Sequence, residues 1–237
     1  MIGVIPARYG STRLEGKVLK DICGKPMVQH IWEAAKKAVL LDDVIVATDD
    51  ERVMKAVASF GGKAVMTAKE HASGTDRIVE AVFSVDCDIV INIQGDEPLV
   101  EPAMLDLLAD AMLSDEKLQM ATLIKKIENA SELDNHNVVK IVLDRNNFAI
   151  YFSRSRIPFL RFEPASYYKH IGIYAYTKDF LLTFAALKPS PLEKAEGLEQ
   201  LRAIENGYKI KAVETNVDTI AVDVAEDLKL VELKLRA

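Results

Sequence analysis

Short apolar runs alternate with helical patterns through the first half of this 237-residue chain. The predicted strands cover residues 2–5, 44–47, 63–66 and 88–93, and the predicted helices cover residues 26–39, 51–60, 76–83 and 102–113. The strand at 88–93 is mostly β-branched, as is typical of a strand covered on both faces of a parallel sheet. Four successive strand–helix units therefore predict an α/β fold with a doubly wound, mainly parallel sheet.

The second half of the chain departs from this alternation. Strand patterns at 120–127, 138–143, 149–153 and 171–176 follow one another with few helical patterns between them. Residues 191–206 are predicted to form one helix, capped by Ser190 and ended by Gly207, before a strand at 209–214 and a helix at 225–235. A chain of this length suits one domain with an insertion, so we interpret residues 1–237 as a single domain and residues 120–190 as an inserted mixed-sheet region.

The composition argues against several classes of protein. The 30 basic and 36 acidic residues give a net charge of −6, which disfavours binding to nucleic acid or to an anionic membrane surface. Membrane-span and signal-peptide patterns are both missing from the sequence. Cys23 and Cys87 lie far apart without metal-ligand spacing, as expected for reduced thiols. We therefore expect a cytoplasmic protein.

A basic loop that contains small residues follows the first predicted strand. The stretch PARYGSTRLEGK, residues 6–17, has neither the Walker A spacing nor the dinucleotide GxGxxG spacing. It offers three basic side chains, Arg8, Arg13 and Lys17, around the tripeptide GST. Small residues let backbone N–H groups turn toward an anion, and arginine and lysine supply charge. The loop is a candidate to hold a di- or triphosphate, and a solvated basic loop is the alternative.

Two carboxylates stand where the strand at 88–93 stops, in the sequence QGDEP. In open α/β sheets, ligands bind beyond the carboxyl ends of the strands, and Mg²⁺ prefers one or two carboxylates together with phosphate oxygens. Asp96 in QGDEP and Asp223 in TIAVDVAEDL are candidates to hold Mg²⁺ beside a triphosphate. The alternative is that the acids only favour the N-terminus of the next helix. Together with the basic loop, they favour phosphoryl or nucleotidyl transfer.

Seven motifs in chain order resemble those of the 3-deoxy-manno-octulosonate (Kdo) cytidylyltransferase family. They are IPARYGSTRL.GK, ATDD, SGTDRI, NIQGDEP, YFSRS.IP, HIGIYAY and PLEKAEGLEQLRAIENG, and they span essentially the whole chain. The resemblance implies a nucleotidyltransferase-type, Rossmann-like fold whose mixed-sheet region binds the sugar and forms a homodimer. It implies the reaction of CTP with the sugar acid Kdo to give CMP-Kdo and pyrophosphate, for lipopolysaccharide biosynthesis.

The resemblance also implies a role for each matching residue. The nucleotide-binding residues would be Ala7, Arg8, Arg13, Lys17, Ser73, Gly74, Thr75, Arg77 and Gln94. Arg8, Arg13 and Lys17 would hold the triphosphate and act in catalysis with Asp96, while Asp96 and Asp223 would hold Mg²⁺. The residues alone allow a plainer reading, in which Ser73 or Thr75 caps a helix.

The sugar end would be built from later motifs. By resemblance, Arg154 would bind the Kdo carboxylate as a two-pronged donor, and His170, Tyr174, Glu199 and Gln200 would bind the hydroxyl groups. Without the resemblance, these side chains would be read as structural, core or solvated residues.

Several residues depart from the family pattern. Glu15, Val18, Arg156 and Ala225 each replace a proline, and the change in the VDTPEDL motif makes Asp223 less secure than Asp96. Asp218, in an earlier VDT, is a weaker metal candidate. Two alternative functions remain: a cytidylyltransferase for another acid sugar, such as 8-amino-Kdo or a sialic acid, or a non-catalytic sensor of nucleotide sugars.

Overall fold

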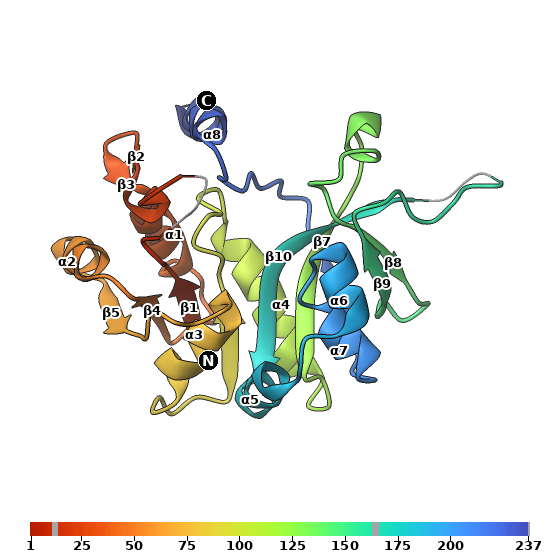
Figure 1. The fold of residues 1–237 in the computed structure, drawn as a ribbon, viewed down its shortest axis with the longest axis horizontal. Coiled ribbons are helices and arrows are strands. Elements are labelled where there is room, and N and C mark those ends of the chain that lie inside the picture. Colours follow the sequence, from red (N-terminus) through yellow and green to blue (C-terminus); the bar gives the residue numbers. More distant parts are fainter. Residues whose placement is uncertain (11–13, 163–165, 237) are drawn as a thin grey trace.

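The centre of the molecule is a mixed but mainly parallel sheet. The computed structural model describes residues 1–10, 14–162 and 166–236. The strands run in the order β11-β7-β10-β6-β1-β4-β5 (Figure 1). They are β1 (Ile2–Pro6), β4 (Asp43–Thr48), β5 (Lys63–Met66), β6 (Ile89–Asn92), β7 (Met120–Lys126), β10 (Tyr168–Thr177) and β11 (Lys211–Glu214). Strands β6, β1, β4 and β5 are parallel neighbours, whereas β10 is antiparallel to both β6 and β7.

Helices cover both faces of this sheet. They are α1 (Met27–Ala35), α2 (Glu51–Ser59), α3 (Gly74–Val82), α4 (Pro102–Ser114), α5 (Lys178–Ala186), α6 (Pro191–Glu196), α7 (Leu201–Glu205) and α8 (Ala225–Arg236), with short 3₁₀ helices η1 (Lys17–Leu19) and η2 (Ala130–Glu132). Alternate residues of β1 enter opposite clusters: Ile5 packs in the cluster of α1 and α4, and Val4 packs in that of α3 and α5. The predicted doubly wound, mainly parallel α/β fold is confirmed. None of the described helices is both long and apolar enough to cross a membrane.

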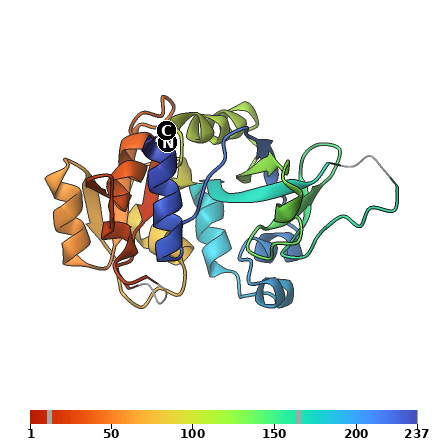
Figure 2. The ribbon, with the colours of Figure 1, turned by 90° about the horizontal axis from the view of Figure 1, so that it is seen from above.

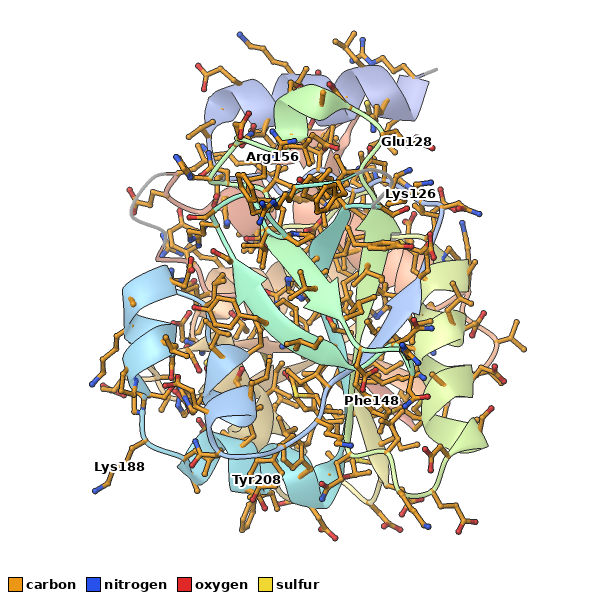
Figure 3. The ribbon with its side chains drawn as sticks, turned by 90° about the vertical axis from the view of Figure 1, so that its right-hand side faces the viewer. Lys126, Glu128, Phe148, Arg156, Lys188 and Tyr208 are labelled. Carbon is orange, nitrogen blue, oxygen red and sulfur yellow. The ribbon has the colours of Figure 1, made fainter. Side chains whose placement is uncertain are left out.

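The second half of the chain completes the main sheet and also extends beyond it. Strands β7 and β10 lie inside the sheet, and the hairpin of β8 (Lys140–Leu143) and β9 (Ala149–Ser153) pairs with the first residues of β10. Figure 3 looks onto this side, where the hairpin crosses in front of the sheet and Phe148 lies at its lower end. The range 120–190 therefore supplies interior strands of the main sheet as well as the β8–β9 hairpin beside it.

The C-terminal helix returns to the first half of the chain. A segment without helix or strand leads from β11 to α8, which lies near the short strands β2 (Asp21–Ile22) and β3 (Lys25–Pro26) and near α1 (Figures 1 and 2). Its residue Val231 is buried in the same cluster as Ile22. This return brings residues 215–224 across the carboxyl ends of the parallel strands.

Two helical regions in the second half of the chain differ from the prediction. The helix α5 was not predicted; it begins at Lys178 and is capped by Thr177, whose Oγ1 accepts the N–H of Phe180 at 3.3 Å. The single helix predicted at 191–206 is two helices, because Gly197 ends α6 in the left-handed conformation, with φ of 62°. Residues 198–200 then leave the helical path before α7 begins. This break gives Glu199 and Gln200 directions that a continuous helix would not.

Candidate active site

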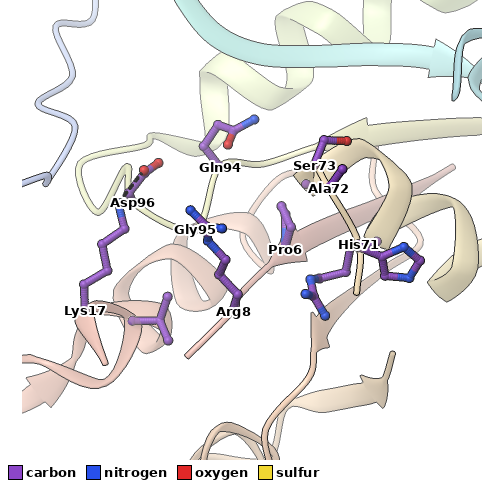
Figure 4. A pocket seen from close by; sticks show the side chains of 12 residues that line it. Pro6, Arg8, Lys17, His71, Ala72, Ser73, Gln94, Gly95 and Asp96 are labelled. Carbon is purple, nitrogen blue, oxygen red and sulfur yellow. Dashed lines mark hydrogen bonds and ion pairs between the residues drawn. The ribbon is translucent and has the colours of Figure 1, made fainter. Parts of the chain in front are cut away.

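A pocket of about 300 Å³ opens at the carboxyl ends of β1 and β6 (Figure 4). Its walls are the loop after β1, the N-terminus of α3 and the loop after β6. The predicted nucleotide-binding residues that line it are Arg8, Lys17, Ser73, Gly74, Arg77 and Gln94. This is the place where open α/β sheets bind ligands. Arg13, together with the rest of 11–13, lies outside the described residues.

The other predicted nucleotide residues stand behind this wall. Ala7 is wholly buried; its N–H donates to Ala47 O at 2.8 Å, and its carbonyl oxygen accepts from Thr48 Oγ1 at 2.6 Å. Thr75 is also buried, and its hydroxyl group donates to Glu199 Oε2 at 2.6 Å. Ala7 therefore supports the loop, and Thr75 connects the nucleotide pocket to the predicted sugar end.

The loop after β6 passes very close to the end of β1. A Cβ atom added to Gly95 would lie 2.3 Å from the carbonyl oxygen of Pro6, which is closer than real Cβ contacts come. Ile93 N–H extends the pairing by donating to Val4 O at 2.9 Å. Glycine is required at position 95 for this approach, and the approach carries the next residue, Asp96, to the mouth of the pocket (Figure 4).

Lys17 gathers the two predicted metal carboxylates around one ammonium group. Its Nζ donates to Asp96 Oδ2 at 2.8 Å, to Val222 O at 3.0 Å and to Asp223 Oδ1 at 3.4 Å. Val222 N–H in turn donates to Asp96 O at 2.8 Å, so the two segments are fixed to each other. The structure therefore brings together Lys17, Asp96 and Asp223, which were all predicted for the catalytic centre. The two carboxylates already bind a cationic group, the ammonium group of Lys17.

This donor set fits a magnesium ion that also binds phosphate. Among the described residues, no cluster of three or more His, Cys, Asp or Glu side chains could hold a metal by itself. Asp96 and Asp223 supply two carboxylates, which is what Mg²⁺ takes when a substrate phosphate completes its shell. Asp218, the weaker candidate, instead pairs with Lys169 at 2.8 Å.

Glu97, the second carboxylate of QGDEP, is buried, and the sequence predicted no role for it in the site. Burial, and then the neighbouring charge of Asp96, raise the pKa of Glu97 to about 8. Its Oε2 atom has no hydrogen-bond partner in the part of the chain that the structure describes. Glu97 is thus largely neutral at pH 7.

The N-terminus of α3 forms the opposite wall. Ser73 caps the helix, since its Oγ accepts the N–H of Asp76 at 3.1 Å and its own N–H donates to Asp76 Oδ2 at 3.1 Å. The choice between Ser73 and Thr75 as the cap is therefore decided for Ser73. Arg77 turns away from solvent: it donates to Asp49 Oδ2 at 2.9 Å, to Ala68 O at 3.2 Å and to Thr67. Its guanidinium group therefore stabilises the wall of the pocket and does not project into the pocket.

The predicted sugar residues on β10 are aromatic, with Tyr174 buried and His170 half-buried. His170 accepts from or donates to Thr122 Oγ1 at 3.0 Å, and its ring lies 5.3 Å from that of Tyr174. Burial lowers the pKa of His170 to about 3, so the imidazole is neutral at pH 7. Burial and the charge of Glu199 raise the pKa of Tyr174 well above its usual value. Both side chains are therefore neutral hydrogen-bonding groups.

Glu199 and Gln200 carry polar atoms that the described residues leave without hydrogen-bond partners. These atoms are Glu199 Oε1 and Gln200 Nε2, and both are buried. Burial raises the pKa of Glu199, although Thr75 donates to its other oxygen. A buried polar atom without a hydrogen-bond partner is costly, and the predicted sugar end offers one acceptor, 3.7 Å from Arg202 Nη2, and one donor of this kind.

Arg154 has a different environment from the one predicted. Its Nε, Nη1 and Nη2 donate to the carbonyl oxygens of Glu196, His136 and Gly197 at 2.8, 3.0 and 3.4 Å. A carboxylate would therefore have to compete with these carbonyl groups. Its role toward the sugar acid stays a prediction.

Comparison with known proteins identifies the family. The cytidylyltransferase family model matches residues 2–210. The chain is 49% identical to the 3-deoxy-manno-octulosonate cytidylyltransferase of Geobacter metallireducens, over 98% of the chain and 96% of that protein. It is 51% identical to the protein of that name from Syntrophus aciditrophicus, over 96% and 94%.

Solved structures agree with this result. A CMP:2-keto-3-deoxy-manno-octonic acid synthetase complexed with CTP superposes with a TM-score of 0.95 and 47% identity, over 99% of this chain and 98% of the other. A putative glucose-1-phosphate thymidylyltransferase from Bacillus anthracis, 17% identical, superposes with a TM-score of 0.71 over 100% of this chain and 96% of the other, and so shares the fold. The chain belongs to the 3-deoxy-manno-octulosonate cytidylyltransferase family.

Proposed function

We propose that this protein transfers the CMP group of CTP to Kdo and releases pyrophosphate, as a step in lipopolysaccharide biosynthesis. The observation that carries the proposal is the meeting of Lys17, Asp96 and Asp223 at the mouth of a pocket lined by Arg8 and the N-terminus of α3. A protein that only bound a nucleotide sugar would not need a second carboxylate beside Asp96. Family membership makes CTP and Kdo the substrates to expect.

The nucleotide would lie across the pocket with its phosphates toward Lys17. Arg8, Arg13 and Lys17 would neutralise the triphosphate, and the N-terminus of α3 at Ser73 and Gly74 would favour negative charge nearby. Gln94, on the facing wall, would hydrogen-bond the cytidine end. Because Lys17 already donates to Asp96 and Val222, triphosphate binding would redirect some of its hydrogen bonds.

Asp96 and Asp223 would hold Mg²⁺ against the phosphate oxygens. When bound, the ion would supply Lewis-acid stabilisation of phosphate charge and lower the pKa of a nearby hydroxyl group. The two aspartates come from separate loops that Val222 N–H ties together at 2.8 Å, so this chain holds their spacing.

The reaction would be an in-line displacement at the α-phosphorus of CTP. The anomeric oxygen of Kdo forms a new bond to phosphorus, the bond to the pyrophosphate oxygen breaks, and the hydroxyl proton leaves to solvent. The chain contributes mainly orientation and charge stabilisation, with Lys17 and the arginines offsetting charge on the departing pyrophosphate.

Kdo would lie between the metal carboxylates and the buried groups of β10 and the α6–α7 break. Glu199 Oε1, which lies 3.7 Å from Arg202 Nη2 and receives no hydrogen bond from the described residues, would accept a hydrogen bond from a hydroxyl group, and Gln200 Nε2 would donate to a hydroxyl oxygen. His170 and Tyr174 would also contact the sugar, and because both are neutral they would not repel its negative charge. The hydrogen bond between Thr75 and Glu199 would couple the position of the sugar contacts to the N-terminus of α3, which lines the nucleotide pocket.

We also expect a homodimer formed through the inserted region, residues 120–190. Phe159 and Phe162 expose 89% and 79% of their surface there, and exposed phenylalanines on one loop favour contact with another protein surface. Light scattering coupled to gel filtration measures the mass directly. A monomer at micromolar concentration would contradict this expectation.

Pyrophosphate release tests the function. The assay supplies CTP, Mg²⁺ and one sugar acid from a panel of Kdo, 8-amino-Kdo and a sialic acid. Turnover with Kdo at the highest kcat/KM supports the proposal, and a preference for another member reassigns the substrate. Binding without release from any of them would indicate a sensor. Asp96→Asn serves as the inactive control.

A further inference from the structure

Lys140, the first residue of β8, is wholly buried, although lysine is almost never fully buried unless it is paired. Its ammonium group donates to the carbonyl oxygens of Asn135, Val138 and Arg154 at 2.9, 2.6 and 2.6 Å. These bonds use all three protons of the ammonium group. Burial lowers the pKa of Lys140 below its usual value. An apolar side chain here would leave three carbonyl groups unpaired.

Arg154 continues this network toward α6. Its guanidinium group donates to carbonyl oxygens of His136, Glu196 and Gly197, and its backbone N–H donates to the carboxylate of Glu196 at 2.9 Å. Arg154 therefore ties the loop that Lys140 holds to the end of α6. The two residues act in series, because Lys140 fixes the backbone of Arg154 and Arg154 fixes Gly197.

The segments joined in this way carry the proposed sugar contacts. Glu199 and Gln200 follow Gly197 directly, in the break between α6 and α7. The loop on the other side accepts the N–H of His170 through the carbonyl oxygen of Val139, at 2.8 Å. A change in this network would therefore displace proposed sugar contacts that lie on two separate elements, β10 and the α6–α7 break.

We infer that Lys140 is a positioning residue for the sugar acid: through Arg154 it fixes the break that aims Glu199 and Gln200. The inference rests on the proposed function, which gives those side chains their substrate. Lys140 does not need to touch the substrate, since its protons are donated to backbone oxygens. A lysine with a purely structural role would affect stability, or both substrates together, so the test separates the sugar from the nucleotide.

Lys140→Met keeps most of the side-chain volume and removes the donors. We expect the KM for Kdo to rise about tenfold, as for a misplacement approaching 1 Å, while the KM for CTP stays within about twofold. Lys178→Met is the matched control, because Lys178 also donates to backbone carbonyls, those of Phe83 and Val85, beyond the opposite end of β10. Equal rises of both KM values in Lys140→Met, or the same Kdo-selective rise in the control, would overturn the inference.

A double variant tests whether the effect passes through Arg154. If it does, Lys140→Met combined with Arg154→Lys raises the KM for Kdo no further than the more severe single change. Multiplied effects would mean that the two residues act independently, against the inference. Glu196→Ala removes the side-chain acceptor of the Arg154 N–H without touching Lys140, and it is used if Lys140→Met does not fold. A KM for Kdo unchanged in Glu196→Ala would also overturn the inference.

Hydrogen exchange supplies a readout that does not depend on turnover. In Lys140→Met the amides of residues 197–201 should exchange faster than in the wild-type protein, while those of β1 and β4 keep their protection. Unchanged exchange at 197–201 would refute the connection. If the wild-type protein releases no pyrophosphate from CTP and Kdo, the proposed function fails, but exchange still tests the hold of Lys140 on the break.

Discussion

Replacing Gly95 by alanine tests the close approach of β1 and β6 that aims Asp96. The added Cβ atom would lie 2.3 Å from the carbonyl oxygen of Pro6, whereas real Cβ contacts stay beyond 3.0 Å. One of the two backbones must therefore move by at least about 0.7 Å, the difference between these distances. The atom that it meets belongs to the backbone, so a side-chain rotation cannot relieve the clash.

Both stability and turnover should suffer. Overpacking of a tight contact costs roughly 1–3 kcal/mol, which corresponds to a fall in melting temperature of about 2–12 °C for a domain of this size. Since a displacement of about 1 Å at a reacting centre can cost about a hundredfold, a shift of about 0.7 Å should lower kcat by at least about tenfold. The KM for Kdo should change less, because Glu199 and Gln200 lie on other elements.

Pyrophosphate release and thermal unfolding together decide this prediction. Gly74→Ala is the matched control for stability, because a Cβ atom there meets the ring of the same Pro6 at an ordinary 3.5 Å. Its melting temperature should stay close to that of the wild-type protein. Wild-type kcat and melting temperature in Gly95→Ala would refute the argument that this contact positions Asp96.

Three further predictions follow from the site. Asp96→Asn and Asp223→Asn should each lower kcat about a hundredfold or more, as for the loss of one preorganised charge contact. Asp218→Asn should not, because the Asp218 carboxylate pairs with Lys169. Kinetics at saturating Mg²⁺ check this, and a larger loss in Asp218→Asn than in Asp223→Asn would exchange the two metal assignments. Arg8→Ala should weaken the binding of CTP far more than that of CMP, because the lost contacts are to the outer phosphates; calorimetric titration compares the two, and equal weakening would move Arg8 to the nucleoside. Burial lowers the pKa of His170 to about 3 in the folded protein, against 6.5 when it is unburied. Between these two pH values the unfolded chain binds a proton on His170 that the folded protein does not bind. Stability should therefore fall as the pH drops from about 6.5 toward 3, and His170→Gln should flatten this dependence in thermal unfolding; an unchanged profile would contradict it.

The elements of the first half were readable from the sequence because their signals are local. The β-branched run at 88–93 became β6, and the strand predicted at 63–66 is β5 with the same bounds. The sequence QGDEP could also be interpreted locally in part, since Gly95 and Asp96 lie in the loop that follows the buried strand β6. The sequence could not tell that Gly95 faces Pro6, because that contact joins two strands.

The break inside 191–206 shows where local reasoning fails. Gly197 stands in a pattern that is otherwise helical, and a single glycine there is tolerated in many helices. In this fold, Arg154 binds the carbonyl oxygens of Glu196 and Gly197 from outside, which favours ending α6 at that point. The deciding partner is distant in sequence, so the residues near Gly197 carry no sign of it.

The sequence by itself determined which kinds of chemistry this protein can perform. A basic loop after the first predicted strand, QGDEP after the fourth and VDVAEDL at the start of the last helix provide the charges for nucleotidyl transfer, and each can be recognised within a dozen residues. The tertiary structure alone decided which of these charges meet. Lys17 reaches Asp96 across 79 residues and Asp223 across 206, and Arg154, a suitable carboxylate ligand by type, is surrounded by backbone carbonyl groups instead. The physical reason is that strand and helix signals depend on neighbours a few positions away, whereas ion pairs depend on where the order and register of the sheet place the ends of its strands.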